Sequence, residues 1–252
     1  MDFIDTHCHI HAADYNLEGD VAINNAIASG VNRLICVGTD ENDSALAVNF
    51  ANSNKNVWAS VGLHPHDAKL GQEAFDKLSE LVKMPKVVAI GECGLDYYYN
   101  HSTKEDQIKA LRFQIELALS NNLPMIFHIR DAFDDFWPVF DEYSDVRGVV
   151  HSFTATNTEL EQALARGLYI GLNGIMTFTK DENQLKAAKN VPIDKLVLET
   201  DAPFLTPKPL RGKINEPKNV ILTAEFLASL RNENLQQISQ ATTQNAVKLF
   251  NL

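Results

Sequence analysis

Short apolar runs alternate with longer segments of mixed polarity along the whole chain. Continuous apolar runs of this length are typical of strands that are covered on both faces. We therefore predict eight buried strands, separated by other elements. They are Phe3–Ile4 into Asp5, Arg33–Val37, Val57–Gly62, Val87–Gly91, Pro124–Phe127, Gly148–Val150, Leu168–Leu172 and Leu196–Glu199.

The longer segments between the runs have the apolar spacing of amphipathic helices. In Glu105–Ser120, apolar residues recur every three or four positions, which places them on one helical face. Thr103 is a suitable N-cap for this helix, and Gly30 and Gly167 stand where helix C-caps are expected. Further helices are predicted at Val21–Ser29, Ser44–Asn52, Glu73–Val82, Asp134–Phe140, Glu159–Arg166, Glu182–Lys189, Asn219–Leu230 and Asn234–Phe250.

The alternation of strands and helices predicts an α/β protein with a parallel sheet. A chain of 252 residues has the usual size of a closed (β/α)₈ TIM-type barrel, so we expect a single domain of this class over residues 1–252. A doubly wound open sheet is the alternative. The sequence has no G-x-G-x-x-G motif after a strand, which weakens that alternative.

Composition and charge narrow the possible partners. The formal net charge of −11 is unlike that of non-specific duplex-binding proteins, which are usually basic, so any attraction for nucleic acid must be local. Neither a secretory signal nor an apolar run of about 18 residues is present, which predicts no membrane association. Three cysteines without a C-x-x-C motif are typical of buried free thiols. We expect a cytoplasmic monomer without an obligate protein partner.

Histidines and carboxylates gather where the apolar runs end. His7 and His9 follow the first run, and the alternation of strand side chains puts both imidazoles on one face, with Cys8 on the other. In a barrel, the residues after each strand lie at the carboxyl-terminal rim, where the active site of this fold sits. The candidate ligands at five strand ends are His7, His9, Glu92, His128, His151 and Asp201.

These nitrogen and oxygen donors suit Zn²⁺, Mn²⁺ or, with more carboxylate, Mg²⁺. Six candidates exceed the ligand number of one tetrahedral site, so we predict two divalent ions that share Glu92. His7, His9 and Asp201 would complete the first site. His128 and His151 would complete the second. The alternative is a single ion, with some of these residues bound only indirectly.

Eight stretches of the chain, in order, match the motifs of a known family: Asp5–His9, Gly62–Asp67, Ala89–Tyr98, Phe127–Ala132, Val149–Phe153, Leu198–Leu205, Pro209–Pro217 and Thr242–Phe250. By these stretches the chain resembles the TatD family of metal-dependent deoxyribonucleases, within the amidohydrolase-like barrels. The resemblance implies a TIM-type barrel that hydrolyses phosphodiester bonds of DNA with a metal-activated water, acting as an exonuclease on strand ends or single strands. It also implies the same six metal ligands.

We assign catalytic roles to Asp201 and Glu92. Asp201 is the predicted general base as well as a ligand, because it can take the proton of the attacking water and pass it to the departing oxygen. Glu92 is the predicted bridging ligand. Substitution of Asp201 by Asn is expected to leave the fold intact and remove most of the turnover.

Four further residues are predicted to contact substrate. His64 and His66 could bind a phosphate, or could simply form a turn around Pro65. Arg130 could bind phosphate, or could pair with a nearby aspartate. Arg211 lies in the one local basic cluster, with Lys208, Lys213 and Lys218, which could contact a nucleic-acid backbone or form a solvated loop. Tyr97, Tyr98 and Tyr99 could stack on bases or pack under the loop.

Two other functions remain open. Barrels of this type also cleave other esters and amides, and a D-aminoacyl-tRNA deacylase would use the same ligands. Many such relatives use a modified lysine as the bridging ligand, whereas this chain has Glu92, which favours the nuclease. A non-catalytic binding module is the third possibility, and the complete ligand set at five strand ends argues against it.

Overall fold

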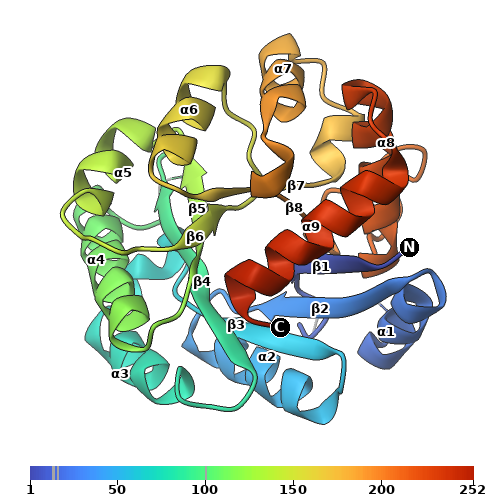
Figure 1. Ribbon diagram of the computed structural model, residues 1–252. Helices are drawn as coiled ribbons and strands as arrows, with labels where there is room; N and C mark the ends of the chain where they lie inside the picture. Colours follow the sequence, from blue (N-terminus) through green and yellow to red (C-terminus); the bar gives the residue numbers. More distant parts are fainter. Residues whose placement is uncertain (13–14, 16, 100) are drawn as a thin grey trace. The chain divides into compact units, whose positions relative to one another are not determined.

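A computed structural model describes residues 1–12, 15, 17–99 and 101–252. Eight strands alternate with helices, and they follow one another in the sheet in the order of the sequence (Figure 1). The strands are β1 Phe3–Cys8, β2 Val31–Val37, β3 Val57–Val61, β4 Val87–Asp96, β5 Met125–Arg130, β6 Gly148–Val150, β7 Tyr169–Leu172 and β8 Leu196–Leu198.

The helices agree with the predicted amphipathic segments to within a few residues. They are α1 Gly19–Ala28, α2 Glu41–Ser53, α3 Gln72–Leu81, α4 Lys104–Ser120, α5 Phe133–Phe140, α6 Asn157–Ala165, α7 Glu182–Asn190, α8 Val220–Arg231 and α9 Leu235–Phe250. The described residues also form short 3₁₀ helices that were not predicted: η1 Pro65–Leu70, η2 Gly174–Thr177, η3 Ile193–Lys195 and η4 Pro217–Asn219. Among the described residues, no helix combines the length and the apolar character needed to cross a membrane.

The predicted helix ends are confirmed. The Thr103 side chain accepts a hydrogen bond from the backbone N–H of Asp106 and so caps α4. Gly30 and Gly167, which follow the C-cap residues Ser29 of α1 and Arg166 of α6, have φ values of 92° and 78°. Glycine adopts this left-handed region without steric cost, which lets the chain turn from each helix into the next strand.

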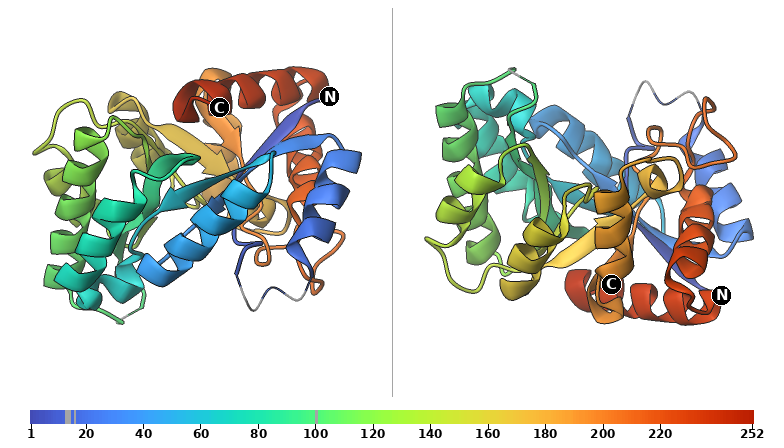
Figure 2. Two further views of the ribbon diagram at one scale, coloured as in Figure 1. Left: turned by 90° about the horizontal axis from the view of Figure 1, so that it is seen from below. Right: turned by 90° about the horizontal axis from the view of Figure 1, so that it is seen from above.

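The chain divides into two compact units, which are described separately. The first comprises Met1–Cys36 and Ser152–Leu252. In this unit β1 pairs in parallel with β2, and β7 pairs in parallel with β8. Helix α9 packs on β1 and β8 at their amino ends (Figure 2), where Asn245 donates to the backbone oxygen of Leu196. The carboxyl ends of β1 and β8 are thereby left open for other side chains.

The second unit comprises Val37–His151. Its strands β3 to β6 are parallel, each paired with the next. Phe127 of β5 packs edge-on against Phe136 and Phe140 of α5, at ring-centroid distances of 5.2 and 5.8 Å. This aromatic contact fixes α5 on the strand that carries His128.

Cys8, Cys36 and Cys93 are free and buried, as the sequence predicts. The Cys8 thiol is directed at the backbone oxygen of Ile35, away from its two histidine neighbours. The prediction of a single domain over residues 1–252 stays a prediction.

Candidate metal centres

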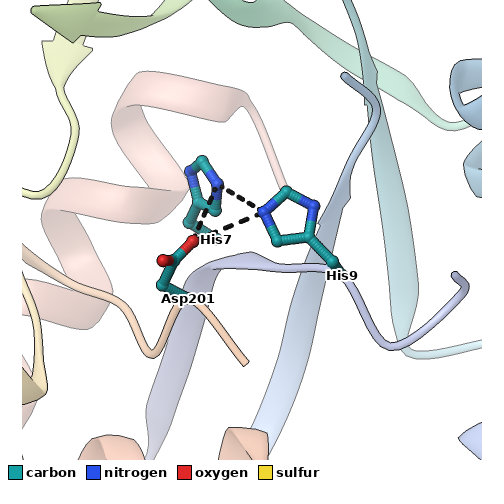
Figure 3. A group of neighbouring side chains, drawn as sticks. All are labelled: His7, His9 and Asp201. Atoms are coloured by element: carbon teal, nitrogen blue, oxygen red, sulfur yellow. Dashed lines mark hydrogen bonds and ion pairs between the residues drawn. The ribbon is translucent and has the colours of Figure 1, made fainter. Parts of the chain in front are cut away.

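The first unit brings together three of the predicted ligands (Figure 3). His7 Nε2 and His9 Nε2 are 3.1 Å apart. The Oδ1 atom of Asp201 lies 3.5 Å from the first and 3.4 Å from the second. His7 is fully buried, and the other two side chains are at most 15% exposed. The carboxyl ends of β1 and β8 thus converge on one small polar cluster.

The spacing of these three atoms suits a divalent ion. Ligands at about 2.1 Å in a tetrahedral zinc site lie about 3.4 Å from one another. The three measured separations are close to that value, and the donors are two imidazoles and one carboxylate. This donor set agrees with the predicted preference for Zn²⁺, Mn²⁺ or Mg²⁺.

Asp5 and Thr200 hold this cluster in place. The buried Asp5 carboxylate accepts hydrogen bonds from the Thr200 backbone N–H and hydroxyl, and from the His7 backbone N–H. These bonds tie the end of β1 to the residue before Asp201. Asp201 itself has a φ of +59°, a conformation that Asp and Asn tolerate better than most residues. The roles of Asp5 and Thr200 were not predicted, because their contact spans 195 positions of the sequence.

The second unit centres on the Oε1 atom of Glu92. His128 Nδ1 lies 2.7 Å from this atom, and the Nε2 atoms of His64 and His151 each lie 3.6 Å from it. The predicted ligands Glu92, His128 and His151 are therefore neighbours. His64, which we predicted as a substrate contact, also lies in the cluster. Candidate ligand atoms of His64, Glu92 and His128 are all within 4.8 Å of one another.

Asp96, four residues after Glu92 on β4, is a second carboxylate in this cluster. Its Oδ2 atom lies 3.0 Å from the Nε2 atoms of both His66 and His128. Burial raises the pKa of Asp96, but the hydrogen bonds from His128 and the Tyr99 backbone outweigh it and hold the pKa below its usual value. Metal-binding histidines commonly donate their second N–H to such a carboxylate, which fixes the ring. Asp96 is placed to orient His128 in this way.

The close approach of β4 to β5 also fixes this cluster. Gly94 has a φ of +146°, and a Cβ atom there would lie 2.0 Å from the backbone oxygen of His128. Only glycine fits this contact, so the backbone that carries Glu92 can run directly beside His128. Burial lowers the pKa of His128, but the hydrogen bonds to Asp96 and Glu92 raise it above its usual value.

The hydrogen bonds of His64 define its tautomer. The backbone N–H of His66 donates to His64 Nδ1 across 3.2 Å. A nitrogen that accepts a hydrogen bond uses its lone pair, so the proton of a neutral ring is on Nε2. Burial and the nearby His128 keep the pKa of His64 well below its usual value, against the opposing effect of Glu92. His64 therefore presents an N–H donor to the cluster, which favours the predicted substrate contact over metal ligation.

The predicted arginines lie on aromatic rings. The Arg130 guanidinium is 3.9 Å from the centroid of the Tyr98 ring, and the Arg211 guanidinium is 3.8 Å from that of Phe178. Arg211 also donates to the backbone oxygen of Thr206. Both side chains are exposed. Their predicted contacts with substrate stay predictions.

Among the functional candidates, sequence reasoning missed Asp96. Residues 92 and 96 lie on one face of a strand because strand side chains alternate. This signal could have identified Asp96, had the fourth strand been extended beyond Gly91.

Similar proteins of known structure or description identify the fold and the class of enzyme. The solved structure of YjjV, a TatD homologue from Escherichia coli K12, has a TM-score of 0.93 and 29% identity, and the match covers 99% of this chain and 98% of that one. A Bacillus subtilis relative, described as the uncharacterized metal-dependent hydrolase YabD, is 37% identical over 98% of both chains. The protein is thus a (β/α)₈ TIM-type barrel and a metal-dependent hydrolase, and both predictions are confirmed.

The particular family follows from two further matches. The model of the TatD related DNase family matches residues 4–251. A Citrobacter rodentium relative, described as the 3'-5' ssDNA/RNA exonuclease TatD, is 35% identical over 97% of this chain and 96% of its own length. The chain belongs to the TatD-related DNase family, as its motifs predict.

Proposed function

We propose that this protein is a metal-dependent nuclease that hydrolyses phosphodiester bonds of DNA, as an exonuclease. The observation that carries the proposal is the pairing of His/carboxylate clusters with strand carboxyl ends in each unit, in a chain whose relatives include a named 3'-5' ssDNA/RNA exonuclease. The six ligands predicted from the sequence are His7, His9, Glu92, His128, His151 and Asp201. The number of ions and the sharing of Glu92 stay predictions.

Divalent ions held by these ligands would lower the pKa of a water molecule toward neutrality and offset the charge that builds on the phosphate oxygens. The other steps belong to side chains of this chain. Asp201 takes the proton of the attacking water and delivers it to the departing oxygen. His64 donates its Nε2–H to a phosphate oxygen, since its Nδ1 accepts from the His66 backbone N–H. Asp96 holds the imidazole rings of His66 and His128 in position.

Substitution of Asp201 by Asn tests this assignment. Asn keeps the shape and tolerates the φ of +59°, but it cannot accept the proton. We expect the rate of ssDNA cleavage in Mn²⁺ or Mg²⁺ to fall by about 100- to 10,000-fold, with an unchanged circular dichroism spectrum. The matched control is Asp194→Asn, an exposed carboxylate before the opposite end of β8, which should cleave at the wild-type rate. A near-normal rate for Asp201→Asn refutes the base assignment.

The same assay separates the alternative function. End-labelled single-stranded DNA, duplex DNA, RNA and D-aminoacyl-tRNA are each incubated with protein and metal, and again with chelator. DNA cleavage that is lost on chelation supports the nuclease. Deacylation without cleavage of any strand would replace it with an esterase acting on aminoacyl-tRNA.

The predicted cytoplasmic location is part of the proposal. The buried free thiols of Cys8, Cys36 and Cys93 are consistent with a reducing compartment. The monomeric state and the lack of an obligate protein partner stay predictions.

A further inference from the structure

Two of the three consecutive tyrosines after β4 are exposed beside the second cluster. Tyr98 is 56% and Tyr99 is 42% exposed, so both rings present aromatic surface to solvent. Tyr97 differs from both, because it is only partly exposed, and the Lys104 ammonium lies 3.8 Å from its ring centroid. The aromatic surface available to a ligand therefore belongs to Tyr98 and Tyr99.

Arg130 extends this surface. Its guanidinium lies 3.9 Å from the Tyr98 ring centroid and 5.0 Å from that of Tyr99. The two tyrosine rings meet edge to face, with centroids 4.7 Å apart and an interplanar angle of 84°. We call Tyr98, Tyr99 and Arg130 together the tyrosine platform. It combines exposed π faces with one positive charge, in a protein whose formal net charge is −11.

Asp96 fixes the platform to the candidate metal centre. Its Oδ1 atom accepts hydrogen bonds from the backbone N–H groups of Tyr98 and Tyr99, at 2.9 and 3.1 Å. Its Oδ2 atom contacts His66 and His128. The Tyr99 ring also lies 5.4 Å from the His66 ring. A ligand on the platform is therefore held at a set distance from His128.

We propose that the tyrosine platform stacks an unpaired nucleobase of the strand whose phosphodiester bond is cleaved, a proposal that rests on the nuclease function above. Aromatic rings bind bases of any sequence because every base has a π face, and arginine adds a cation–π contribution. Bases in a duplex are paired and stacked on both sides, so the platform selects single strands. Stacking does not read the 2′-hydroxyl, so the platform accepts DNA and RNA alike.

Binding to oligonucleotides with single abasic sites tests the platform. Fluorescence anisotropy is measured with labelled dA12 in Mn²⁺, with phosphorothioate linkages that prevent cleavage during the titration. A tetrahydrofuran abasic site replaces each terminal nucleotide in turn. For the wild type we expect one position to lower affinity by about 5- to 150-fold when its base is removed. Tyr98→Ala should weaken binding of intact dA12 by a similar factor, and the abasic site at that position should then have no further effect.

Two variants serve as controls. Tyr98→Phe keeps the ring and should bind like the wild type. Tyr143→Ala removes a tyrosine that instead donates to Glu116, and it should keep the abasic profile of the wild type. The platform is overturned if each abasic site weakens the wild type and Tyr98→Ala equally, or if the wild type does not bind dA12. Cleavage of unmodified dA12 is assayed separately, so that a protein that binds bases but does not hydrolyse DNA contradicts only the nuclease function.

Discussion

At the scale of single residues, one carboxylate organises much of the second unit. Asp96 contacts two histidines through one oxygen and two backbone N–H groups through the other. When neutral His128 donates from Nε2 to Asp96, the lone pair of its Nδ1 is left toward Glu92, as metal ligation requires. The tautomer of a predicted ligand thus depends on a residue that need not touch the ion.

The substitution Asp96→Asn is expected to invert this tautomer. An amide NH₂ facing His128 requires Nε2 to accept, which moves the ring proton to Nδ1 and blocks the lone pair next to Glu92. We expect the affinity for Mn²⁺ or Zn²⁺ to fall by about 10- to 100-fold, as measured by isothermal titration calorimetry.

The control for this substitution is Asp106→Asn, at a partly exposed carboxylate in the first turn of α4. It has the same change of charge and should bind metal like the wild type. If Asp96→Asn also kept wild-type affinity while folding normally, Asp96 would have no role in orienting His128.

At the scale of secondary-structure elements, Arg231 joins two helices of the first unit. It lies in the last turn of α8, and its Nη1 donates to the backbone oxygens of Ala188, Lys189 and Val191 at the end of α7. The last carbonyl groups of a helix have no hydrogen-bond donor within the helix. The buried Arg231 guanidinium therefore supplies the donors for these carbonyl groups of α7. Glu233 balances the charge through two further hydrogen bonds.

Replacement of Arg231 by Met should therefore destabilise the protein. The methionine keeps the apolar stem but leaves three carbonyls without their charged donor. We expect the free energy of unfolding to fall by about 2 to 4 kcal/mol, measured by urea denaturation. Arg112→Met removes an exposed arginine that pairs with Glu142, and the urea midpoint should shift much less in this control. Equal shifts in the two variants would contradict the capping role of Arg231.

The elements were predictable because their apolar patterns are regular, and the errors have a physical cause. The fourth and fifth strands were predicted to end at Gly91 and Phe127, but β4 and β5 continue to Asp96 and Arg130. The apolar pattern stops at these points because the next side chains, Glu92 and His128, face the polar cluster. The backbone nevertheless continues the parallel pairing of β4 with β5. The pairing of Asp5 with Thr200 was not predictable, since no local pattern reports a contact between distant strand ends.

At the scale of the whole molecule, net charge affects how strongly the protein binds a polyanion such as DNA. With 33 acidic and 22 basic residues, the chain has an excess of negative charge that opposes binding to the phosphate backbone. Basic nucleic-acid-binding proteins gain affinity from the release of counterions at many phosphates. Here the proposed contacts are a stacked base and a few polar groups near the candidate metal centres, so few counterions should be released.

The salt dependence of binding measures how many counterions are released, and therefore how many phosphates the protein neutralises. For a single strand, the slope of log K against log salt is about −0.7 per neutralised phosphate, so one to three contacts predict a slope between about −0.7 and −2. The measurement is the anisotropy titration of phosphorothioate dA12 from low to physiological NaCl at constant Mn²⁺. A slope steeper than about −4 would require an extended basic track that the proposal does not include. An uncharged methylphosphonate strand is the control, and its slope should be close to zero because it has no counterions to release.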